Sequence, residues 1–335
     1  MLIPDYWADA KRTTPINGRM RTIRRFGWSL VGQADAQAMA DERAEDAVRE
    51  LSSGASIRWL EPKRAYNGAD GVPIREEVLS RHGESVITRN SYGSHCLNTP
   101  RVLIADVDFE YLDSRGSACL TIAVLLVAMI GTLIALAGAG WVAIPQVILI
   151  GVSSLVLIPM AVLLVRDWLS KAWVRSQDGF GPLTRHRIDR FLETNPDWAI
   201  RIYETPNGMR LIATHRLFEA REAEVERFFE AIVADPVYRR MCRNQNCFRA
   251  RLTAKPWRMP GFAAGKIHGG VWPIPEVMRP ERAGWVREYE AKAIGFAACR
   301  YVDSVGSGNV HSQVRAVVEL HDRLSRADQP ELAMA

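Results

Sequence analysis

The most informative absence in this sequence is a long stretch without charge. Between Gly116 and Val165 the chain has no Asp, Glu, Lys, Arg or His. About 20 apolar residues in a helix cross a bilayer core, so this segment is long enough to cross twice. We expect two transmembrane helices, at about 118–138 and 142–165, with "GAGW" as the turn between them. A helical hairpin buried in a soluble core is the alternative, which the length of the uncharged run disfavours.

Other absences bear on location. The N-terminal "MLIPDYWADAKRTTP" lacks the basic segment and apolar core of a signal peptide. The five cysteines are odd in number and irregularly spaced, which predicts free thiols in a reducing compartment. The predicted turn has no basic residue, whereas Arg166, Lys171 and Arg175 follow the second span. By the positive-inside rule we expect a protein that crosses the lipid bilayer twice, with both termini in the cytoplasm.

Helical and strand patterns occur on both sides of the uncharged segment. Residues 33–52 and 311–327 have helical periodicity. "WAIRIYETPNGMRLIATH" has two strand-like arms around Pro-Asn-Gly, which predicts a hairpin. "IREEVLSRHG" is typical of a short helix that ends at a glycine. We expect one cytoplasmic α+β domain, formed by residues 1–115 and 167–335 and interrupted by a transmembrane α-helical hairpin at 116–166.

The segment "VLIADVDFEY" (102–111) indicates metal chemistry. Its apolar start is typical of a buried strand, and Asp106, Asp108 and Glu110 then alternate, so they share one face. Neighbouring carboxylates repel each other unless a cation lies between them. Mg²⁺ or Mn²⁺ takes one or two carboxylates together with substrate phosphates, which predicts a phosphoryl-transfer metal site at Asp106 and Asp108. A solvent-exposed strand end is the alternative.

A basic stretch could supply the phosphate ligands of such a site. Residues 236–275 contain eight Lys or Arg and no acid. In "CFRARLTAK", Arg249, Arg251 and Lys255 alternate with apolar residues, so one strand face could clamp a triphosphate or a nucleic-acid backbone. Contact with anionic lipid is the alternative. His215 ends the predicted hairpin and is a candidate substrate or phosphate ligand, although surface histidines have the same pattern.

Several longer segments carry a resemblance that covers most of the chain. They are "RRFGWSLVGQADAQAMADERA", "AYNGADGVPIREE", "ITRNSYGSHCLNTPRVLIADVDF" and "MCRNQNCFRARLTAKPWR". In these segments the chain resembles a set of uncharacterised proteobacterial two-helix membrane proteins. The resemblance implies a two-helix topology in the bacterial inner membrane and no particular activity.

Short motifs carry a second resemblance, to the archaeo-eukaryotic primase–polymerase superfamily. Asp106 and Asp108, at the end of an apolar strand, match its Asp-x-Asp motif. Thr214 and His215, after Pro-Asn-Gly, look like its histidine motif, and Asp303 in "CRYVDSVG" looks like its third acid. The resemblance implies that the three aspartates hold metal and that Asp106, Asp108 and His215 are catalytic. It also implies phosphate contacts by Arg249, Arg251 and Lys255.

These observations leave three functional hypotheses. The first is a membrane protein whose cytoplasmic domain has a metal-dependent nucleotidyl- or phosphoryl-transfer site, or a nucleotide-binding site. The alternative is a non-catalytic, membrane-associated module that binds nucleic acid or anionic lipid through its basic strand. A structural or assembly component without a small-molecule site is a third possibility. The first hypothesis requires Asp106 and Asp108 to face His215 and the strand of Arg249 and Arg251.

Overall fold

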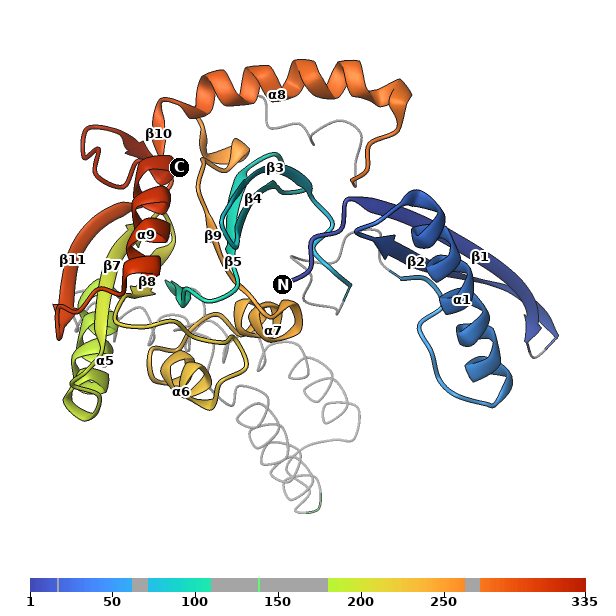
Figure 1. Ribbon diagram of the computed structural model, residues 1–335, viewed down its shortest axis with the longest axis horizontal. Coiled ribbons are helices and arrows are strands. Elements are labelled where there is room, and N and C mark those ends of the chain that lie inside the picture. The colour runs from blue at the N-terminus through green and yellow to red at the C-terminus, as the bar shows by residue number, and fades with distance from the viewer. Residues whose placement is uncertain (17, 62–71, 110–137, 139–179, 263–271) are drawn as a thin grey trace. The chain divides into compact units, whose positions relative to one another are not determined.

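Figure 1 shows the protein as a computed structural model that describes residues 1–16, 18–61, 72–109, 138, 180–262 and 272–335. The described chain is a mixed α/β fold. It divides into two compact units, Met1–Asp106 with Phe191–Ala335, and Val107–Arg190. The six α-helices of the described part are α1 (Gln33–Ser52), α5 (Phe180–Thr194), α6 (Ala223–Ala231), α7 (Pro236–Gln245), α8 (Arg279–Ala293) and α9 (Ser312–Ser325).

These helices correct the predicted fold class of an α+β domain interrupted by a transmembrane α-helical hairpin. Within the described ranges, no helix has both the length and the apolar composition needed to cross a membrane. The longest of them, α1, buries four alanines along one side but also carries six acids and two arginines. Residues 116–166, where the hairpin was predicted, lie outside the described residues except for Gly138. The location of the termini, which was inferred from that hairpin, stays a prediction.

The N-terminal part of the chain is a long antiparallel hairpin with a helix packed on it. Its strands are β1 (Tyr6–Ile16) and β2 (Arg19–Ser29), paired over their full length. The helix is α1, whose predicted range of 33–52 is confirmed. Small side chains form the contact between them, namely Ala8, Ala10, Ala36, Ala40 and Ala44.

A second sheet has four antiparallel strands in the order β3-β4-β5-β9. Its strands are β3 (Glu77–His82), β4 (Ser85–Arg89), β5 (His95–Thr99) and β9 (Phe248–Arg251). The predicted helix over "IREEVLSRHG" is therefore wrong, because most of this segment is β3. Its charged residues are held by partners distant in sequence: Arg249 pairs with Glu76, and Arg282 of α8 pairs with Glu77.

A third sheet has the order β11-β7-β8-β6. It is built from β6 (Ile104–Asp108), β7 (Ala199–Thr205), β8 (Gly208–Ala213) and β11 (Arg300–Gly306). The hairpin predicted around Pro-Asn-Gly is confirmed as β7 and β8. Helix α9 packs on one face of this sheet, where its Asp322 bonds to Arg201 and Tyr203 of β7. The remaining elements are short: β10 (Phe296–Ala297), β12 (Ala333–Met334), and two 3₁₀ turns, η2 (Pro256–Arg258) and η3 (Glu276–Met278).

The contact between α1 and the N-terminal hairpin depends on the missing side chain of Gly27. A Cβ atom at this position would overlap the backbone of Ala36 and Ala40. We expect Gly27→Ala to destabilise the protein by about 1–3 kcal/mol, as overpacking does, because helix and strand must separate. Gly284→Ala in α8 is the control, since its Cβ meets open space and alanine favours a helix by about 1 kcal/mol. Urea denaturation measures the stability of both variants. Equal effects would contradict the steric role of the missing side chain of Gly27.

Candidate functional site

Asp106, the first of the predicted metal ligands, is bound to a buried arginine. Arg210 of β8 donates from Nε to Asp106 Oδ1 at 2.8 Å and from Nη2 to Oδ2 at 3.2 Å. The third guanidinium nitrogen, Nη1, donates to the Arg251 carbonyl at 2.9 Å. Such a two-point contact is among the stronger side-chain pairings. The negative charge of Asp106 is therefore neutralised from within the sheet.

The Arg210 guanidinium also reaches α9. Its Nη1 lies 3.3 Å from His321 Nε2, and His321 Nδ1 lies 2.8 Å from Asp322 Oδ1. Because a guanidinium only donates, Nε2 must accept, and the ring proton sits on Nδ1 and is donated to Asp322. Asp322 also accepts from Tyr203 and Arg201, each at 2.7 Å. We call this chain of contacts, from Asp106 through Arg210, His321 and Asp322 to Tyr203 and Arg201, the Arg210 network.

Ionisation in the Arg210 network follows from these contacts. Although burial acts to raise it, hydrogen bonds from His321 and Tyr203 hold the pKa of Asp322 below its ordinary value. Burial, together with the Asp322 charge, raises the pKa of Tyr203 well above its ordinary value. The phenol therefore stays protonated and donates, as the geometry requires.

Cys299 completes an arrangement with the residue types of a nucleophilic triad. Its Sγ lies 3.8 Å from His321 Nε2, on the opposite side of the ring from Asp322. Cys299 and His321 are both fully buried. Burial leaves no approach for a substrate to either group. The cluster is part of the core and does not form a catalytic site.

The predicted phosphate ligands on β9 are also engaged within the protein. Arg249, 4% exposed, donates to Glu76 Oε2 at 2.5 Å, and Glu76 accepts in turn from Thr88. Arg251 donates to the carbonyls of Thr253 and Ala335. The ammonium of Lys255 lies 5.6 Å from the centroid of the Trp257 ring. The two arginines of the predicted clamp therefore point into the protein.

His215 lies at the end of β8 in an aromatic environment. Its ring centroid is 4.8 Å from that of Trp198 and 5.3 Å from that of Phe218. Its Nδ1 accepts from the Ala199 backbone N–H at 3.3 Å. Burial, with help from the neighbouring Arg216 charge, lowers the pKa of His215, so the ring is neutral at pH 7. His215 and Asp106 therefore lie in different environments.

The remaining predicted ligands lie at two different strands. Asp108 ends β6 and is half-buried. Asp303 lies on β11, at the opposite edge of the sheet from β6. Three strand spacings separate these edges, roughly 14 Å in an ordinary sheet, so Asp303 and Asp106 are not brought together. Among residues that the structure describes, no group of three or more His, Cys, Asp or Glu could hold a metal ion. The Mg²⁺ or Mn²⁺ site stays a prediction.

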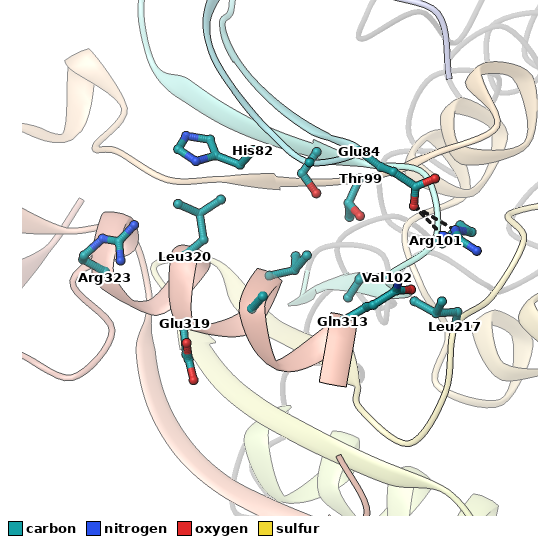
Figure 2. A pocket seen from close by; sticks show the side chains of 14 residues that line it. His82, Glu84, Thr99, Arg101, Val102, Leu217, Gln313, Glu319, Leu320 and Arg323 are labelled. Carbon is teal, nitrogen blue, oxygen red and sulfur yellow. Dashed lines mark hydrogen bonds and ion pairs between the residues drawn. The ribbon is translucent and has the colours of Figure 1, made fainter. Parts of the chain in front are cut away.

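A groove beside α9 is the feature of the described chain best suited to a ligand. It has a volume of about 670 Å³ and lies between α9, the turn joining β3 to β4, and the end of β5. Figure 2 shows His82 and Arg323 at one end and Arg101, Glu84 and Gln313 at the other.

The groove has an apolar floor with polar groups at its ends. Val102 and Leu320 are buried beneath it, and Leu320 points from α9 toward the strands (Figure 2). Ser85 and Thr99, each 2% exposed, contribute hydroxyl groups to the lining. At one end Arg101 binds Glu84 through Nε at 2.9 Å and Nη2 at 2.6 Å.

The buried ion pair and the His321-Asp322 pair have signals in the sequence outside the motifs. Arg210 is a lone charge in the apolar run "GMRLIA", which is typical of a buried ion pair, and His321-Asp322 interrupts the apolar face of α9. The groove has no such signal, because its lining comes from segments up to about 240 residues apart in the sequence.

Comparisons of the chain with protein-family models, with curated proteins and with solved structures find no match. The resemblances suggested by the sequence motifs therefore stay predictions, and the function is argued from geometry.

The role of Asp106 can be tested through its partner. Arg210→Met leaves the half-buried Asp106 carboxylate and the Arg251 carbonyl without their donor, so we expect a loss of about 1–3 kcal/mol in the free energy of unfolding. The double variant Asp106→Asn/Arg210→Met should recover part of this loss, because no unpaired charge remains. Arg279→Met is the control, since Arg279 is exposed. Strictly additive effects in urea denaturation would contradict a structural ion pair.

The lowered pKa of Asp322 predicts a pH dependence of stability. Its ionised form is favoured in the folded state, so its contribution is present above the ordinary carboxyl pKa and is lost as pH falls through the lowered value. Asp322→Asn should cost about 3–5 kcal/mol at pH 7 and flatten the acid limb of the stability curve. Asp328→Asn, at an exposed site after α9, is the matched control. An unchanged acid limb in Asp322→Asn would refute this assignment.

Proposed function

We propose that the protein is a ligand-binding protein whose groove beside α9 takes an elongated organic anion with an apolar body. The observation that carries this proposal is the groove itself, an apolar floor with an exposed cation at one end. Its volume of about 670 Å³ lies within the range of small-molecule sites. Most described charges elsewhere in the core are already paired.

The two ends of the groove differ in the charge that they offer. At one end, Arg323 has no carboxylate partner in the described part of the chain, and His82 lies beside it in the lining (Figure 2). At the other end, Arg101 is already paired with Glu84. Figure 2 also shows Glu319 directed away from the strands that line the groove. An anionic headgroup is therefore favoured at Arg323, where it gains a charge-assisted hydrogen bond without displacing another acid.

The middle of the groove favours an apolar body. Val102, Leu217, Val317 and Leu320 supply aliphatic surface, and each buried CH₂ group of a ligand contributes about 0.8 kcal/mol. The hydroxyls of Ser85 and Thr99 can accept or donate a hydrogen bond to a polar group along the chain. No chemical step is assigned to these residues, so the proposed activity is binding.

The metal-dependent transfer hypothesis has less support from the arrangement of its residues. Arg210 already neutralises Asp106, and Glu76 neutralises Arg249. A metal or a phosphate would have to displace a buried partner at each position, which costs several kcal/mol.

Decanoate and decyltrimethylammonium test the groove, because they share an apolar body and differ in headgroup charge. We expect isothermal titration calorimetry to detect decanoate binding and weaker or no binding of the cation. Arg323→Gln should weaken decanoate binding about tenfold or more, since a charge-assisted hydrogen bond contributes about 1.5–3 kcal/mol. Arg315→Gln, an exposed position of α9 outside the groove lining, removes the same charge and should leave binding unchanged.

A second variant tests whether decanoate binds in the groove. Ala316 lines the groove and is exposed, so Ala316→Trp should fill the space and abolish decanoate binding without lowering thermal stability. Decanoate binding that survives Ala316→Trp would place the site elsewhere, and equal binding of both amphiphiles would exclude a role for the Arg323 charge.

A further inference from the structure

The outer half of the N-terminal hairpin has side chains exposed on both faces. We call its residues 11–16 and 18–22 the arm. On one face Thr13 lies opposite Thr22, with their hydroxyl oxygens 3.2 Å apart, and Met20 beside them is 66% exposed. The other face is the one on which α1 packs, and Arg19 and Arg21 are exposed there beyond the fully buried Ile23. A two-stranded ribbon that buries so little gains little stability from its own packing.

The arm is positively charged without internal compensation. Residues 11–22 contain four Lys or Arg and no acid. Arg12 is neutralised by Asp41 and Glu45 of α1. Lys11, Arg19 and Arg21 have no carboxylate partner within the described ranges.

The acids of this part of the chain lie on α1, so positive and negative charge are segregated between the hairpin and its helix. The Arg21 guanidinium is held 5.4 Å above the Trp59 ring, which limits its freedom while leaving its donors accessible.

From this geometry we propose that the arm binds double-stranded DNA by entering the major groove. A two-stranded ribbon, with strands about 4.8 Å apart, fits a groove about 12 Å wide. The face without α1 meets the floor of the groove, and the long side chains of Arg19 and Arg21 reach the phosphates along its walls. Lys11, Arg19 and Arg21 contact phosphates in this arrangement.

The face with Thr13, Thr22 and Met20 matches base edges. Threonine hydroxyls bond to acceptors and donors of the bases, and an apolar side chain contacts the thymine methyl group. Duplex RNA is a poorer match, because its major groove is too narrow for side chains to read. The shape of the arm thus favours B-form DNA over other polyanions.

Fluorescence anisotropy of a labelled DNA duplex with the full-length protein tests the proposal. We expect the logarithm of the binding constant to fall with the logarithm of salt concentration with a slope of about −2.7, for three phosphate contacts. The triple variant Lys11→Ala/Arg19→Ala/Arg21→Ala should bind at least about tenfold more weakly at low salt and lose most of this slope.

The matched control removes the same charge elsewhere. Arg279→Ala/Arg287→Ala/Lys292→Ala changes three exposed cations of α8 and should leave DNA affinity within about twofold of the unaltered protein. Equal losses in the two triple variants would overturn the assignment to the arm. Equal affinity for duplex RNA or heparin would show a general polyanion surface and overturn the groove geometry. Absence of DNA binding at low salt would overturn the proposal outright. Circular dichroism of each variant confirms that the fold is retained.

Discussion

The third sheet depends on one buried guanidinium, that of Arg210. It binds the Asp106 carboxylate of β6, the Arg251 carbonyl of β9 and the His321 ring of α9. Each partner comes from a different element, and each would lose a charge-assisted hydrogen bond without it. Because a guanidinium has five donors in a rigid plane, it also sets the tautomer of His321, and hence the bond from His321 to Asp322. The helix and the three strands are positioned by this single group.

This pairing determines which charges remain for function. Asp106 and Arg249, which look like a metal ligand and a phosphate ligand in the sequence, are each held by an opposite charge inside the protein. In the described part of the chain, the exposed cations without a carboxylate partner include Arg323 of α9 and those of the N-terminal arm. A charged residue in a catalytic motif can bind a ligand or metal only if its charge is not already neutralised by an ion pair within the fold. Both of our proposals therefore rest on exposed cations.

Local elements could be predicted where the pattern and the tertiary partners agree. Helix α1 and the β7–β8 hairpin match their predicted ranges because small or apolar residues recur with the right period and a turn signal separates the strands. "IREEVLSRHG" failed because its acids pair with Arg249 and Arg282, from segments about 170 and 200 residues away. The N-terminal hairpin was not predicted, although Asn17-Gly18 is a recognised turn signal between its strands. The transmembrane hairpin in the predicted fold class does not agree with the helices that the structure describes.

By itself the sequence determined the local periodicities, the acid-free basic segments and the alternation of side chains on strands, since each depends only on neighbouring residues. The tertiary structure alone decided which charges are neutralised and which space remains open. Arg210 meets Asp106 across 104 positions, and Arg201 meets Asp322 across 121. The groove is likewise lined from β3 to α9. The physical reason is that electrostatic pairing and cavity shape depend on distances in space, and residue types and their spacing along the chain do not specify those distances.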